Sequence, residues 1–102
     1  MDELDFNKKA LPIKWSVEKN QHLINCRLVS FEEVLLALSK RKLIKIIPSP
    51  THLAQNCLVV EIRNYAYVIP YVEDDEKIFL KTIYPSRKFT KYFLREEDNE
   101  RY

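Results

Sequence analysis

Two neighbouring cations near the carboxyl end carry the strongest chemical signal in the sequence. Arg87 and Lys88 follow Ser86, a residue type that favours the N-cap position of a helix, so both are expected in the first helical turn. The helix dipole disfavours cations there by roughly a few tenths of a kcal/mol. Free backbone N–H groups flanked by two cations suit a phosphate group. We therefore predict a phosphate-binding site at this helix start. The alternative is that the two cations have no function there and that solvent screens their unfavourable interaction with the helix dipole.

Two further residues complete the candidate catalytic set. Lys81, in the strand expected just upstream, would serve as a second charge partner for phosphate or as a proton donor with a lowered pKa. The alternative is that its ammonium group only extends to solvent. His52 lies in a proline-bounded loop, and histidine is a residue type suited to acid–base catalysis, although most loop histidines are simply exposed. Glu61 is a base or, on the safer interpretation, a salt-bridge partner.

Three residues around the cationic pair are candidates for binding nucleic acid. Lys91 would add a third charge, while Tyr84 and Tyr92 flank the basic helix and would stack on bases. Such stacking contributes roughly 1–3 kcal/mol per base. Other tyrosines alternate on one face of a single strand, which is more typical of sheet packing: Tyr65, Tyr67 and Tyr71.

Composition and charge set the class of protein. The chain has 102 residues, of which 46% are hydrophobic and 31% charged, as expected for one domain (1–102) with its own core. Its net charge of +2 hides segregation, because 77–95 holds six basic residues and no acid. A second basic cluster comprises Lys40 to Lys42 with Lys45. If it lies close to the basic stretch 77–95 in the fold, the two clusters would form one polyanion-binding surface. If not, each cluster is simply a solvated face of the protein.

The absence of glycine excludes every glycine-rich phosphate loop. Turns must instead use Asn, Asp and Pro. Two cysteines, Cys26 and Cys57, fit neither a disulfide framework nor a tetrahedral zinc site, and we expect two buried thiols rather than one disulfide. We expect no metal and no cofactor.

No apolar run approaches the roughly 18–20 residues of a membrane span. The polar and acidic start of the chain does not resemble a signal peptide, so we expect a cytoplasmic protein without membrane contact. Residues 1–12 and 95–102 are expected to be flexible tails.

Two helices are predicted in the first half of the chain. Ser16 caps the first, which runs to about Cys26 with three apolar residues facing inward: Val17, Leu23 and Ile24. Ser30 and Glu33 form a capping box at the start of the second. Its apolar stripe follows helical spacing: Phe31, Val34, Leu35 and Leu38.

A sheet and a short helix are predicted in the second half. Strands are expected at 43–47, 58–62, 65–72 and 77–84, with a tight turn at Asn64. Pro70 cannot donate to a ladder, so its strand should lie at a sheet edge or carry a bulge. Ser86 then caps the final helix, from Arg87 to about Leu94. The fold class is α+β, with two N-terminal helices, an antiparallel sheet of three to four strands and a short C-terminal helix.

Several motifs, taken in order, resemble one protein family. Trp15 with Lys19 and Asn20, followed by Ser-Phe-Glu-Glu from Ser30, is similar to the start of BrnT-like toxins. The stretch Tyr84-Pro-Ser-Arg-Lys-Phe-Thr-Lys resembles their closing strand and Ala-Arg-Lys-Ala-Thr helix, and the resemblance covers roughly 13–94. It departs at Cys57–Leu58, where many members carry Arg, and at Phe89, where they carry Ala.

The resemblance implies a RelE-like fold and a metal-independent endoribonuclease that cleaves messenger RNA. It also implies a cognate antitoxin protein that neutralises the enzyme. Two alternatives stay open: a nucleic-acid binder without cleavage, and a protein-interaction module that accepts a partner strand at an edge formed by the strand of Pro70.

Overall fold

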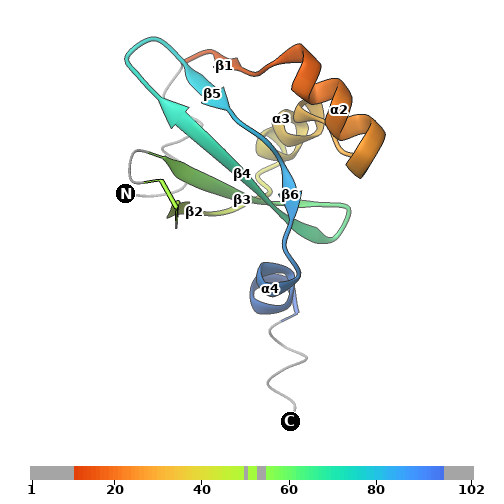
Figure 1. Cartoon of the computed structure of the whole chain (residues 1–102). Helices are drawn as coiled ribbons and strands as arrows, with labels where there is room; N and C mark the ends of the chain where they lie inside the picture. The colour runs from red at the N-terminus through yellow and green to blue at the C-terminus, as the bar shows by residue number, and fades with distance from the viewer. Residues whose placement is uncertain (1–10, 50, 53–54, 96–102) are drawn as a thin grey trace.

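The computed structural model describes residues 11–49, 51–52 and 55–95, which form an α+β fold. Two helices, α2 (Val17–Arg27) and α3 (Phe31–Ser39), lie together on one face of a sheet (Figure 1). A short helix, α4 (Arg87–Phe89), continues as the π-helical turn η1 (Thr90–Leu94). The sheet strands are β1 (Ile13–Lys14), β2 (Leu43–Pro48), β3 (Asn56–Ile62), β4 (Tyr65–Glu73), β5 (Ile78–Leu80) and β6 (Tyr84–Pro85).

The sheet is mixed rather than purely antiparallel. Its order is β1-β5-β4-β3-β2, with β6 pairing with β4 beyond the end of β5. Neighbours from β2 to β5 are antiparallel, whereas β1 pairs with β5 in parallel. The expectation of three to four antiparallel strands was therefore too low, because the short β1 joins the sheet and the strand expected over 77–84 is divided into β5 and β6. Two residues of the expected N-terminal tail are structured, because Leu11 packs on the core and the Pro12 carbonyl accepts from the Ile78 N–H. The other expected tail residues, except Arg95, lie outside the described ranges.

The strand predicted over 77–84 is interrupted, and Pro70 supplies the physical reason. Pro70 lies inside β4, which is paired on both sides, so a sheet edge at this strand is ruled out. Its carbonyl accepts from the Lys81 N–H (2.8 Å), but its ring nitrogen has no proton to return. The ladder breaks there, and three residues, 81–83, lie opposite Ile69 and Pro70. The bulge expected for the strand of Pro70 therefore lies in the segment opposite β4, at residues 81–83, and not in β4 itself.

This extra residue reverses the side-chain alternation beyond β5. A regular strand would place Ile83 on the same face as Phe79 and Lys81. Ile83 is instead fully buried in the helix-facing core with Ile78 and Leu80. One added residue moves every later side chain to the opposite face.

The helix caps follow the sequence closely. Ser16 Oγ accepts from Lys19 N–H (3.1 Å), and both halves of the Ser30–Glu33 capping box are present. Phe31 and Val34 are completely buried, and Trp15 stacks on Phe31 with ring centroids 5.5 Å apart. Helix α3 is therefore held to the sheet as its apolar stripe predicts.

Helix α2 is oriented differently from the prediction. Val17 is 79% exposed and Ile24 38% exposed, whereas Asn20 and Leu23 are buried. The Asn20 amide explains why this face of α2 is buried, since it donates to Glu32 Oε1 (2.8 Å) and accepts from the Phe31 N–H (2.8 Å). Burying an amide costs little when both of its groups are bonded. The expected inward positions of Val17 and Ile24 are wrong.

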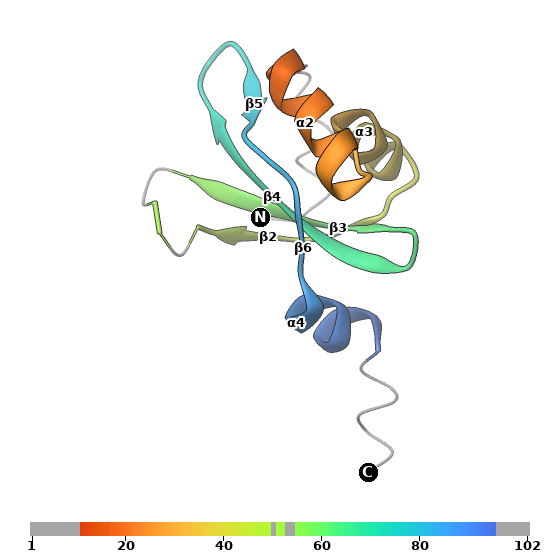
Figure 2. The same ribbon diagram turned by 45° about the vertical axis from the view of Figure 1, so that its right-hand side comes forward.

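The core lies between these helices and the sheet (Figure 2). Its fully buried members come from both layers: Leu23, Val29, Phe31, Val34, Leu58, Val60, Ile69, Ile78, Leu80 and Ile83. Within the described residues, no helix is long and apolar enough to cross a membrane.

The two cysteines differ in environment. Both are free thiols, but Cys26 is exposed on α2 and only Cys57 is buried, so the expectation of two buried thiols holds for one. Burial raises the pKa of the Cys57 thiol and thus lowers its thiolate fraction. Cys26 Sγ lies 3.7 Å from His22 Nδ1.

We predict that one thiol per chain reacts quickly with Ellman's reagent at neutral pH, because Cys26 alone is accessible. The second equivalent should react only after unfolding in guanidinium. A Cys26→Ser variant should lose the fast phase. Two fast equivalents in the folded protein would contradict the buried position of Cys57.

Candidate nucleic-acid interface

A ring of hydrogen bonds fixes the basic helix to the end of β4. The Ala66 N–H donates to Thr90 Oγ1 (2.8 Å), and that hydroxyl donates to the Ser86 carbonyl (2.7 Å). Ser86 closes the ring by donating its N–H to the Ala66 carbonyl (2.9 Å). The Ser86 hydroxyl also caps the helix by accepting from Phe89 N–H (3.0 Å), as predicted. The start of α4 is therefore fixed relative to the sheet.

Three cations project from this anchored segment. Arg87 and Lys88 occupy the first turn of α4, Lys91 follows one turn later, and all three are exposed. The first turn contains no acidic residue, and none of the three forms an ion pair with another described residue. Lys88 Nζ lies 5.9 Å from the centroid of the Phe89 ring. The segment thus presents charge that the described part of the chain leaves unneutralised.

Both candidate stacking residues border the segment. Tyr84 lies in β6 opposite Val68 and is 36% exposed. Partial burial, with a smaller contribution from Cys57, raises the pKa of the Tyr84 phenol, so it stays protonated and can donate a hydrogen bond at neutral pH. Tyr92 is 61% exposed and packs edge-on against Phe93, with centroids 4.9 Å apart. Both rings retain surface available to a base.

Lys81 is exposed and lies over the ring of Phe79, with Nζ 5.6 Å from the centroid. This arrangement matches the alternative in which the ammonium group reaches solvent. Lys81 pairs with Pro70, four residues along β4 from Ala66, which corresponds to about 13 Å of strand. Lys81 therefore lies in the segment between β5 and β6, upstream of the basic helix and outside its first turn.

His52 lies far from the cationic pair. Its loop joins β2 to β3, where Asn56 pairs with Tyr71, five residues or about 17 Å along β4 from Ala66. Figures 1 and 2 agree in placing this loop and α4 at separate ends of the sheet. The exposed ring of His52 bonds Thr51 Oγ1 (2.8 Å). The structure does not bring His52 together with Arg87 and Lys88.

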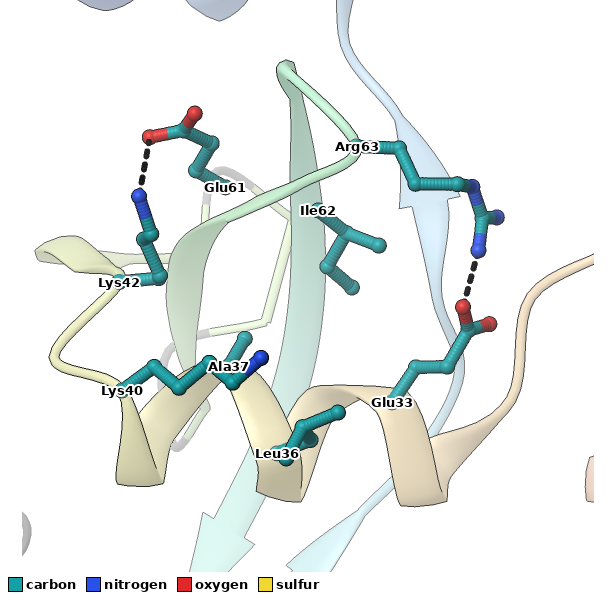
Figure 3. A pocket seen from close by; sticks show the side chains of 8 residues that line it. All are labelled: Glu33, Leu36, Ala37, Lys40, Lys42, Glu61, Ile62 and Arg63. Atoms are coloured by element: carbon teal, nitrogen blue, oxygen red, sulfur yellow. Dashed lines mark hydrogen bonds and ion pairs between the residues drawn. The ribbon is translucent and has the colours of Figure 1, made fainter.

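A separate hollow of about 250 Å³ lies between α3 and the β3–β4 hairpin (Figure 3). Glu61 pairs there with Lys42 (3.9 Å), so its salt-bridge interpretation is the one observed, with a lysine as the partner. On the opposite wall, Arg63 pairs with Glu33. Arg63 also donates to the Leu28 carbonyl (2.7 Å) and thereby links the hairpin to the end of α2.

Sequence reasoning missed Thr90 and Arg63. Thr90 is 1% exposed and satisfies a buried backbone N–H, a partnership that depends on residues 24 positions apart. Arg63 adopts φ 53° beside Asn64 at φ 63°, and both positive values suit a two-residue hairpin turn. The absence of glycine was the sequence signal that could have identified Arg63, because another residue type had to adopt the positive φ before Asn64.

Among the described residues, no group of three or more His, Cys, Asp or Glu side chains could hold a metal ion. No family model, curated protein or solved structure matches the chain. The assignment of function therefore depends on the residues themselves.

We predict that Thr90→Val destabilises the protein by about 1–3 kcal/mol, because it leaves the buried Ala66 N–H without an acceptor. Thr90→Ser keeps the hydroxyl and loses only one methyl group, so it should cost about 0.8 kcal/mol or less. Urea unfolding followed by circular dichroism measures both values. A valine variant as stable as the wild type would show that the ring contributes nothing.

Proposed function

We propose that the chain is a metal-independent endoribonuclease of the toxin type, which cleaves messenger RNA and is neutralised by a cognate antitoxin protein. The observation that carries the proposal is the anchored first turn of α4, where Arg87 and Lys88 are exposed without an acidic neighbour. The order of two helices, sheet and capped basic helix agrees with the RelE-like fold that the resemblance implies.

Metal-free cleavage of RNA requires the 2′-hydroxyl to be activated, the charge on a pentavalent phosphorane to be stabilised and the leaving oxygen to be protonated. Arg87 and Lys88 suit the second task, since a fixed helix start holds them and its N–H groups around one phosphate. Lys91 would bind the adjacent phosphate, and Tyr84 and Tyr92 would stack on or bond to the flanking nucleotides. Lys81 would supply further positive charge upstream.

The 2′-hydroxyl proton would pass to a non-bridging oxygen of the bound phosphate, and the leaving 5′-oxygen would take its proton from this same segment rather than from His52. The loop of His52 leads into β3 at Asn56, which pairs with Tyr71, about 17 Å along β4 from the residue that holds the helix start, Ala66, so His52 is not assigned to a phosphate bound there. Tyr84 lies two residues before Ser86, and its raised pKa keeps the phenol protonated, so it would be the proton donor.

A second function, RNA binding without cleavage, is favoured by one observation. The described residues place no histidine or carboxylate in the first turn of α4, where a general base would have to act. In that case the exposed cations would still neutralise phosphates, with an affinity that falls as salt rises.

We predict that the purified chain cleaves RNA in the presence of EDTA, and that Arg87→Ala lowers the cleavage rate about 10²–10³-fold, the usual effect of losing one transition-state charge partner. RNA affinity should fall as well, with a salt slope smaller by about 0.7 for one lost phosphate contact. Gel assays and fluorescence anisotropy measure the two quantities.

Matched variants separate the alternatives. Lys14→Ala removes an exposed cation from β1, where Lys14 pairs with Phe79 and so lies level with Val72, six residues or about 20 Å along β4 from Ala66, and it should change neither quantity. His52→Ala should also cleave normally. Salt-sensitive binding with intact RNA would favour the non-catalytic function, and an Arg87→Ala variant that cleaves at the wild-type rate would remove the site assignment.

A further inference from the structure

The face of the sheet that points away from α2 and α3, which we call the outer face, carries α4 at one end. Figures 1 and 2 agree in placing α4 on the side of the sheet away from the two longer helices. Side chains alternate between the two faces of a strand, and the core residues Leu58, Val60 and Ile69 face the helices. Val59 and Val68 therefore belong to the outer face, and they pair with each other across β3 and β4.

A bulge in β2 turns Lys45 onto the outer face. In a regular strand Lys45 would share a face with Leu43, which packs on the core. The register shifts between these two residues, because Leu43 pairs with the core residue Val60. Lys45 pairs with the adjacent residue, Val59, so Ile44 is the extra residue of the bulge. The Lys45 side chain thereby leaves the core side of the sheet, and it is exposed.

The irregular segment between β5 and β6 does the same for Tyr84. Its extra residue places Ile83 in the core, so the next side chain, Tyr84, lies on the outer face opposite Val68. One row therefore crosses β2, β3, β4 and β6: Lys45, Val59, Val68 and Tyr84. Three strand spacings place the two ends of this Lys45–Tyr84 row about 14 Å apart. Bulges often re-aim a side chain beside an active site, and here two separate irregularities expose the two ends of one row.

The charges of the outer face favour an anion along the Lys45–Tyr84 row. Lys45 forms no ion pair with another described residue. Within the described strands, alternation places one carboxylate on this face, Glu61, and it pairs with Lys42 (3.9 Å). Lys81 and Lys14 are exposed on the same face but lie further from α4 along β4. The surplus charge of the face is therefore positive.

Two other lysines of the same basic cluster lie elsewhere. Lys40 and Lys42 line the hollow between α3 and the β3–β4 hairpin (Figure 3). Lys42 is also paired with Glu61. Of these three lysines, Lys45 is thus the one that shares a face of the sheet with the cations of α4. The chain itself joins the row to those cations, because Arg87 follows Tyr84 by three residues.

We propose that single-stranded RNA held at the first turn of α4 continues across the outer face along the Lys45–Tyr84 row, and that Lys45 binds a backbone phosphate there. This inference rests on the proposed function and gives the path of its substrate. Proteins that bind single strands combine cations along the backbone with exposed rings for unpaired bases, and the row ends in one of each. Val59 and Val68 are at most 2% exposed, so the contacts come from the two ends of the row.

The test measures equilibrium binding of the full chain to a single-stranded RNA whose 2′-hydroxyls are methylated, so that affinity is read without cleavage. Lys45→Ala should weaken binding several-fold and reduce the salt slope by about 0.7, the value for one phosphate contact on a single strand. Lys40→Ala is the matched control, because it removes an exposed lysine of the same cluster from the hollow beside α3. It should change neither quantity. The same RNA annealed into a duplex should compete poorly.

Cleavage kinetics give a second readout that separates Lys45 from the catalytic set. With cleavable RNA, Lys45→Ala should raise KM and leave kcat unchanged, since Lys45 would contact RNA away from the scissile bond. Arg87→Ala should instead lower kcat. Circular dichroism melts check that each variant is folded, as expected for exposed positions.

Several outcomes would overturn the proposed path. Equal losses of affinity in Lys45→Ala and Lys40→Ala would show an effect of net charge alone, and unchanged affinity in Lys45→Ala would remove the contact. A duplex that competes as well as the single strand would contradict the single-stranded substrate. If Arg87→Ala weakens RNA binding and Lys45→Ala does not, the path fails and the proposed function stands. A wild-type chain that binds no RNA removes both.

Discussion

The hydrogen-bond ring of Ala66, Ser86 and Thr90 is the constraint on which the proposed RNA site depends. A helical segment of eight residues, α4 with η1, has too few internal bonds to be stable alone in water. Its position comes from the sheet, because both backbone groups of Ala66 bond to it. The cations of the first turn are thereby presented on a rigid support rather than on a loose tail, and a rigid support reduces the entropy lost when phosphate binds.

Pro70 determines how the chain reaches that ring. A residue with an N–H at this position could continue the ladder from β5 into β6. Without that donor, three residues lie opposite two, and Ile83 enters the core while its carbonyl accepts from Arg27 of α2 (2.5 Å). The segment before α4 is therefore held by the core and by α2, and Tyr84 follows it on the opposite face. The absence of an N–H group at Pro70 therefore affects both the packing of Ile83 against the helices and the direction in which the chain enters the candidate site.

The sequence could predict what local chemistry determines. The Ser30–Glu33 box and the Ser86 cap join groups three residues apart, so propensity alone identifies them. The orientation of α2 was beyond such reasoning, since the apolar Val17 and Ile24 suggested one face while Asn20 formed two distant hydrogen bonds on another. For the candidate site, the sequence identified the cations. The separation of His52 from those cations depends on the register of the sheet strands, which the sequence alone does not reveal.

The unfavourable electrostatic energy of cations in the first turn of α4 is informative about the function of that turn. At the start of a helix Arg87 and Lys88 each oppose the dipole by about 0.3–1 kcal/mol in the absence of screening, and no acid of that turn offsets it. The same dipole, the free N–H groups and both cations act together once an anion is bound, so the arrangement favours the bound state at the expense of the free one. Leu28, just after α2, and Leu36 of α3 are also unfavourable in water, since both expose large aliphatic side chains. The two surfaces are thus costly in isolation for different physical reasons, hydrophobic in one case and electrostatic in the other.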